Sequence, residues 1–254
     1  MKQRYFIELA YNGTRFHGWQ VQPNATSVQQ SLEYAVGTIC REKIGVTGAG
    51  RTDTGVHASY FVAHFDSENP ELDTPSFVRK LNSFLNADIA VFNLTKVADK
   101  AHARFDAVSR TYRYFIHQAK DPFLQETSWY FKSPLNVGRM NSVCDILLGT
   151  HDFTSFSKLH TDVKTNICNV LEARWERIDN RLVFEIKADR FLRNMVRAIV
   201  GTMILAGQGR ITPDYVDQVI GLKDRAAAGA SAPPEGLFLT DICYPEEVFK
   251  GRSF

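Results

Sequence analysis

The sequence predicts an α+β fold made of two ferredoxin-like (RRM-like) halves. The first observation is the order strand, helix, two strands, helix, strand within residues 1–100, which is the order of a split βαβ unit. The second is that residues 101–254 echo this order without repeating the sequence. The third is a hydrophobic content of 44% over 254 residues, which is sufficient for two cores. We therefore expect one domain over 1–100, a second over 101–254, and a hinge near 97–107.

The elements of the first half follow from the period of their apolar residues. Residues 4–11 alternate as a half-buried strand does, a strand is expected near 60–65 after the glycine-rich loop, and the fourth strand of the unit is expected over 89–96. A helix begins at a capping box formed by Ser27 and Gln30. A second helix begins at Pro75, with Thr74 as its cap. The side chains expected to be buried by these two helices are Val28, Leu32, Ala35, Val36, Ile39, Phe77, Leu81, Phe84 and Leu85.

The second half is assigned in the same way. Strands are expected over 110–117, 170–176, 181–188 and 237–242, the middle two forming a hairpin at Asp179 and Asn180. Helices are expected after Asn136, over 191–206, and from Thr212. The first two should bury one face each, through Met140, Val143, Cys144, Leu147, Leu148, Leu192, Met195, Val196, Ile199 and Met203.

Residues 48–58 form a glycine-rich loop that carries one carboxylate. Its sequence is GAGRTDTGVHA, with Asp53 following the cation Arg51 by two residues. Glycines permit backbone shapes that other residues avoid and let another molecule approach the main chain. The sequence therefore predicts that this loop presents the carboxylate of Asp53 to a ligand. The alternative interpretation is a tight turn in which the aspartate caps its own backbone.

Composition limits the other chemistry that we expect. Four dispersed cysteines without a CxxC pair indicate reduced core thiols, and the seven histidines show no metal-binding spacing, so we expect no metal. No apolar run is long enough for a membrane span and no signal peptide is visible, so a cytoplasmic protein is expected. The net charge of +2 does not decide for or against nucleic acid, but basic residues cluster with aromatic ones near 104–113 and 190–197, which favours RNA.

Several blocks together resemble the TruA family of pseudouridine synthases. The loop around Asp53 is similar to the active-site motif of that family. Further similar blocks follow in the family's order over nearly the whole chain, at 9–14, 16–20, 102–107, 110–114, 151–156, 195–201 and 236–239. Many independent blocks in one order are a stronger signal than any single short motif.

The resemblance implies a fold, an activity and partners. It implies antiparallel sheets joined across a central cleft, and usually a homodimer. It also implies that uridine is converted to pseudouridine in the anticodon arm of tRNA (positions 38 to 40). Because that reaction gains no atom and transfers no electron, we expect no cofactor.

The resemblance also implies roles for individual residues. Asp53 would be the catalytic carboxylate, acting either as nucleophile or as base. Arg197 would orient it and favour its ionised form. Tyr112 would stack on the uracil, although the alternation of the strand places Tyr114 on the same face. Arg51 would assist in flipping the base out of its stack.

Two further residues are candidate substrate contacts. His57 ends the loop motif and Arg193 precedes the helix arginine. For His57, a structural role beside the strand is the alternative.

Two functions from other classes remain as alternatives. Residues 53–55 read DTG, as in aspartic proteases, but that chemistry needs two aspartates and no second DTG is present. A non-catalytic RNA-binding module is the other alternative, because ferredoxin-like sheets often bind RNA through surface aromatic residues.

Overall fold

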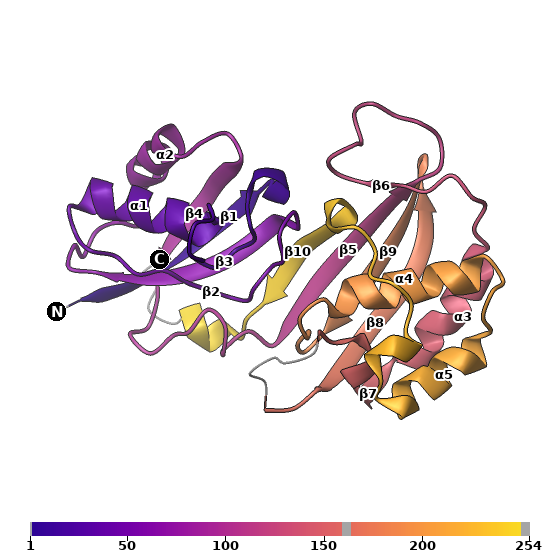
Figure 1. Cartoon of the computed structure of the whole chain (residues 1–254). Coiled ribbons are helices and arrows are strands. Elements are labelled where there is room, and N and C mark those ends of the chain that lie inside the picture. The colour runs from indigo at the N-terminus through magenta and orange to yellow at the C-terminus, as the bar shows by residue number, and fades with distance from the viewer. Residues whose placement is uncertain (1, 159–163, 250–254) are drawn as a thin grey trace. The chain divides into compact units, whose positions relative to one another are not determined.

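The computed structural model describes residues 2–158 and 164–249, and these separate into two compact units (Figure 1). Unit 1 contains the described residues of Met1–Val108 and Leu239–Phe254, and unit 2 is Ser109–Phe238. Each unit combines helices with an antiparallel sheet, so the α+β class is confirmed. Most of the last strand, from Leu239 to Cys243, is grouped with residues 2–108 in unit 1.

The sheet of unit 1 has the strand order β4-β1-β3-β10. These strands are β1 (Gln3–Tyr11), β3 (His57–Ser67), β4 (Ile89–Lys96) and β10 (Leu237–Cys243), and the short β2 (Thr47–Gly48) pairs with β3. β1 is antiparallel to both of its neighbours, β3 and β4. This central position explains why Tyr5, Ile7 and Leu9 are at most 1% exposed.

Two helices of unit 1 pack against this sheet (Figure 1). They are α1 (Val28–Cys40) and α2 (Pro75–Phe84). Ser27 Oγ accepts a hydrogen bond from Gln30 N at 3.2 Å, and Thr74 Oγ1 accepts one from Phe77 N at 3.2 Å, so both expected caps are confirmed. Phe84 was expected in the core but is 43% exposed, because it is the last residue of its helix.

The sheet of unit 2 has the strand order β5-β9-β8-β7. These strands are β5 (Ser109–His117), β9 (Arg181–Ala188), β8 (Ile167–Ile178) and β7 (Gly149–Asp152); the short β6 (Trp129–Tyr130) runs parallel to β5. β8 and β9 form the expected hairpin, and Asp179 at its turn has a left-handed φ of 50°. The helices are α3 (Val137–Leu147), α4 (Met195–Gly207) and α5 (Pro213–Leu222).

Two details of unit 2 differ from the sequence prediction. α4 begins at Met195 and not at Phe191, because Asn194 has a φ of 66° and this left-handed residue cannot belong to a right-handed helix. Leu148 was expected to be buried but is 41% exposed, since it stands just beyond the end of α3. Short 3₁₀ helices in the two units occupy Gly13–Arg15, Thr154–Phe156, Arg225–Ala227, Pro234–Gly236 and Glu246–Phe249.

The cysteines match the sequence expectation of buried thiols in part. All four cysteines are free thiols, and burial raises the pKa of Cys144 and of Cys168 to about 12. Cys40 and Cys243 are only partly buried. Among residues 2–158 and 164–249, no group of three or more His, Cys, Asp or Glu side chains is arranged to hold a metal ion. No helix in the same described part combines the length and the hydropathy that a membrane crossing requires.

A buried histidine links residues 101–107 to the sheet of unit 1. His64 is 6% exposed, and its Nδ1 accepts a hydrogen bond from Ala103 N at 3.1 Å. Its ring stacks on Phe6 and meets His102 edge to face, with ring centroids 4.6 Å apart in the second pair. Burial, the nearby Arg4 and then His102 lower the pKa of His64 to about 4. The imidazole is therefore neutral in the folded protein at pH 7.

The stability of the protein should fall in acid because of this histidine. Since the pKa of His64 is about 4 when folded and 6.5 in the reference state, the unfolded chain binds more protons between these values. The unfolding free energy should therefore fall as the pH is lowered from about 7 to 4, by up to about 3 kcal/mol. Urea denaturation at several pH values measures this. His64→Asn retains an acceptor for Ala103 N and should flatten the dependence; an unchanged dependence would contradict the assignment.

Candidate active site

The loop that carries Asp53 is a turn closed by backbone hydrogen bonds. It leaves β2 and enters β3, and Ala49 N donates to Val62 O at 2.8 Å. Val56 N donates to the main-chain oxygen of Asp53 at 3.1 Å, and Gly55 takes a φ of 76°. The tight turn that we considered as the alternative interpretation is thus present. The hydrogen bond that closes it is accepted by the main-chain oxygen of Asp53 and not by the side chain. The turn can therefore form without using the carboxylate as its cap.

A second segment, residues 11–19, holds the loop from the other side. Tyr11 Oη and Thr52 Oγ1 share a buried hydrogen bond of 2.9 Å, and Trp19 N donates to Thr52 O at 3.3 Å. Gly55 N donates to Phe16 O at 3.3 Å. Thr52 is consequently 9% exposed and serves as the anchor of the loop.

Because Thr52 is buried, the residues before and after it, Arg51 and Asp53, lie toward the surface. Arg51 is exposed and Asp53 is partly exposed, on either side of the buried Thr52. The carboxylate is therefore not sealed in the interior, and its backbone is held by bonds on both sides. Such a group can act on a ligand as a nucleophile or as a base without first ordering a mobile loop.

One glycine outside the loop is required for this contact. Gly18 has a φ of 86°, and a Cβ atom added to it would collide with the carbonyl oxygen of Thr52. By contrast, a Cβ atom at Gly50 would meet nothing within 4 Å. Of the three glycines of the loop, Gly48 and Gly55 are required as expected, because a Cβ atom at Gly48 would collide with the Trp19 ring and Gly55 has a positive φ. Gly18 is a further required glycine outside the loop. Gly18 lies within residues 16–20, one of the blocks that resemble the family, so the sequence carries a signal for it.

His57 is buried beside this loop at the start of β3. It is 1% exposed, and its Nδ1 accepts a hydrogen bond from Gly13 N at 3.0 Å. Because Nδ1 is the acceptor of this hydrogen bond, it is the ring nitrogen that carries no proton. This placement favours the structural role over a direct substrate contact.

Unit 2 separates the two tyrosines that the strand pattern left equivalent. Tyr114 is 0% exposed, its hydroxyl donates to Pro233 O at 2.8 Å, and burial raises its pKa. Tyr112 is partly exposed, and its ring meets Phe191 edge to face with centroids 5.0 Å apart. Tyr114 is therefore a core residue, and Tyr112 is the tyrosine whose ring remains accessible to a ligand.

Arg197 and Arg193 lie at the start of α4. Arg197 is partly buried; its Nε donates to Ala232 O at 2.7 Å, and its own carbonyl accepts from Ala232 N at 2.9 Å. Asn194 Nδ2 donates to Ser231 Oγ at 2.6 Å. Arg193 is exposed just before the helix.

A segment that sequence reasoning missed, residues 228–233, therefore fixes the orientation of Arg197. Its small residues, AGASAP, were a usable signal: Gly229 N donates to Thr202 Oγ1 at 2.9 Å, and a Cβ atom there would crowd Gly201. Asp53, Arg51 and His57 belong to unit 1, whereas the three residues Tyr112, Arg193 and Arg197 belong to unit 2.

Comparison with known proteins gives consistent matches. A family model described as tRNA pseudouridine synthase matches residues 9–106 and 143–245. Among curated proteins, tRNA pseudouridine synthase A of Parabacteroides distasonis is 52% identical over 247 residues, which cover 97% of this chain and 98% of that protein. The protein of the same name from Bacteroides fragilis is 51% identical, covering 98% of this chain and 99% of its own length. That from Bacteroides thetaiotaomicron is 52% identical, covering 99% and 94%.

Substituting Gly18 should disturb the loop that carries Asp53. In Gly18→Ala, the Cβ atom meets Thr52 O and the residue must hold a positive φ, so we expect a loss of about 1–3 kcal/mol in unfolding free energy and lower activity. Gly50→Ala is the matched control, because the added methyl group meets no atom. Thermal and urea denaturation compare the two variants. Equal stabilities would show that the contact between residues 18 and 52 does not hold the loop.

Proposed function

The chain belongs to the tRNA pseudouridine synthase family, and on this basis we propose that it converts uridine to pseudouridine in tRNA. The observation that carries the proposal is the placement of Asp53, a partly exposed carboxylate on a turn held by residues 11–19. It stands within the range matched by the family model.

The reaction is an isomerisation. The bond between uracil N1 and ribose C1′ breaks, the base turns, and a new bond forms between C5 and C1′. The hydrogen on C5 is released as a proton, and N1 gains a proton. Atoms and electrons therefore balance without a redox cofactor or a nucleotide, which agrees with a chain that has no P-loop and no dinucleotide fingerprint.

We assign the difficult step to Asp53. Its carboxylate either attacks C1′ or removes a proton from the sugar, and both routes require an ionised group with access to the ribose. The target nucleotide must leave its stack first, which costs a few kcal/mol. Arg51 is exposed on the same loop, so its planar guanidinium is placed to occupy or stabilise the vacated position.

We assign the residues of unit 2 to the base and to the carboxylate. Tyr112 offers an accessible ring for stacking on uracil, and its hydroxyl is suited to assist loss of the C5 proton. Arg197 is the proposed partner of the Asp53 carboxylate, and its bond to Ala232 O restricts the directions that its guanidinium can take. Arg193 is a proposed phosphate contact. His57 keeps the loop in place through Gly13.

The finer points of the proposal rest on the resemblance. They are action on the 3′ side of the anticodon arm, at positions 38 to 40, a homodimeric state, and work in the cytoplasm without cofactor or metal. A non-catalytic RNA-binding module is not favoured, because full-length relatives carry the name of an enzyme. An aspartic protease is disfavoured for the same reason and by its need for a second DTG.

Replacing the carboxylate should separate binding from chemistry. In Asp53→Asn we expect tRNA binding to survive, while tritium release from C5-labelled uridine falls by about 10²–10⁴-fold, since an amide is neither a base nor an effective nucleophile. Asp99→Asn, at another exposed carboxylate of unit 1, is the control and should retain full activity. Turnover by Asp53→Asn at the wild-type rate would end the enzymatic assignment of this residue.

Replacing Arg51 by lysine tests its proposed part in base flipping. We expect turnover to fall at least about 10-fold while the Kd for tRNA changes less than about threefold, because an ammonium on a flexible stem cannot replace a planar guanidinium. Single-turnover kinetics and filter binding measure the two effects separately. If the Kd rises in step with the loss of turnover, Arg51 is a phosphate contact and has no part in flipping.

A further inference from the structure

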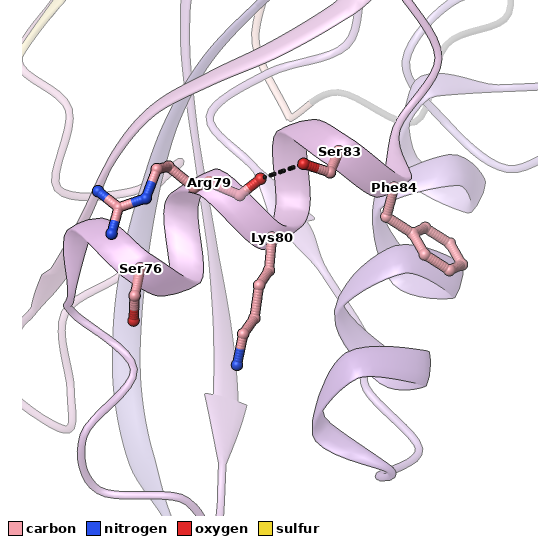
Figure 2. Close-up of a pocket in the computed structure, with 5 residues that line it drawn as sticks. All are labelled: Ser76, Arg79, Lys80, Ser83 and Phe84. Atoms are coloured by element: carbon pink, nitrogen blue, oxygen red, sulfur yellow. Dashed lines mark hydrogen bonds between the residues drawn. The ribbon is translucent and has the colours of Figure 1, made fainter.

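An open groove lies on α2 of unit 1, outside the loop that carries Asp53. It has a volume of about 430 Å³ and is lined by Ser76, Arg79, Lys80, Ser83 and Phe84 (Figure 2). Ser76, Lys80 and Phe84 are spaced by four residues and therefore share one face of the helix. Phe77 and Leu81 are the buried residues of α2, and Phe84, at the end of the helix, lies between their side and that of Ser76. The groove therefore runs along the border between the exposed and the buried face of the helix.

The groove is continued by an aromatic pair that the fold leaves uncovered. Tyr34 of α1 is 69% exposed and Phe84 is 43% exposed, and their ring centroids lie 5.5 Å apart. Neither ring is needed to fill the core, because Leu32, Val36 and Leu81 are fully buried beneath. Two accessible rings in contact offer flat faces for stacking.

The two charged residues that line the groove are both cations. α2 contains Arg79 and Lys80 and no acidic residue, and within the described part of the chain neither cation forms an ion pair. α1 contains a single carboxylate, Glu33, whose Oε1 accepts hydrogen bonds from Gln29 Nε2 and Val46 N at 3.0 Å each. The nearest carboxylate before α2 in the sequence is Asp73, outside the helix. The lining of the groove therefore carries two cations and no carboxylate.

We propose that this face of α1 and α2, the α2 groove, binds the sugar-phosphate backbone of the substrate tRNA at a place other than the nucleotide being modified. Arg79 and Lys80 contact phosphates, and Phe84 with Tyr34 packs against a ribose or an unstacked base. Positive charge next to exposed rings is the combination that nucleic acid matches. The inference rests on the proposed function, which supplies the RNA; it adds a site of contact whose residues do no chemistry.

The double variant Arg79→Ala/Lys80→Ala tests the charges. Both positions are exposed on the helix, where alanine is well tolerated. We expect the Kd for full-length tRNA to rise by about 5-fold or more and the slope of log K against log salt to shrink by about 1 to 2, while kcat at saturating tRNA is unchanged. The control Lys2→Ala/Lys100→Ala removes two exposed lysines from other elements of unit 1 and should leave Kd within about twofold.

The aromatic pair is tested with Tyr34→Ala and Tyr34→Phe. Only the loss of the ring should weaken tRNA binding, so the phenylalanine variant should behave as the wild type.

Three results would overturn the proposal. They are an unchanged Kd for tRNA, an equal effect of the control variant, and a change of oligomeric state in sedimentation without RNA, which would make the groove a protein interface. Failure of the proposed function is distinguishable, since it would appear as wild-type protein that forms no pseudouridine.

Discussion

The structure of the candidate site depends on how Thr52 is anchored. Its side chain is bonded to Tyr11 and its carbonyl to Trp19 N, while the rings of Trp19 and Phe61 stack beneath with centroids 4.1 Å apart. Buried polar contacts of this kind are costly to break, because each separated partner would lose a hydrogen bond without regaining water. A threonine held in this way keeps the residues before and after it at the surface. The backbone of Asp53 is therefore positioned by the anchoring of its neighbour Thr52.

In unit 2, a side chain of the candidate site is likewise held by contacts with a distant segment of the chain. Residues 228–233 run across α4, where they receive bonds from Arg197 and Asn194 and pack against Gly201. Pro233 at the end of this segment accepts the Tyr114 hydroxyl. This one segment of small residues thus restrains the Arg197 side chain and accepts the hydroxyl of Tyr114, the tyrosine that belongs to the core. In both units a reactive or ligand-facing side chain is oriented by backbone contacts made nearby in space but far away in the sequence.

The α2 groove adds a proposed contact with the substrate tRNA away from the nucleotide that reacts. Catalysis requires a rigid site, whereas recognition of a large RNA requires a spread of weak, salt-sensitive contacts. The helices of unit 1 bury one side to stabilise the sheet, which leaves their other side available for such contacts. Exposed rings and cations that contribute nothing to the core are then explained by binding and not by folding.

The sequence by itself determined the fold class, the helix caps at Ser27 and Thr74, the β8–β9 hairpin and the family, because these depend on local periods, on short turn chemistry and on motifs read in order. Tertiary structure alone decided that Tyr114 is buried and Tyr112 is not, that His57 lies inside, that Gly18 is sterically required, and that residues 239–249 belong to unit 1. Each of these depends on a contact between residues distant in the chain, such as Tyr114 with Pro233 or Gly18 with Thr52. Strand alternation and glycine spacing carry no information about such partners, since they report only which residues share a face and where the backbone can bend.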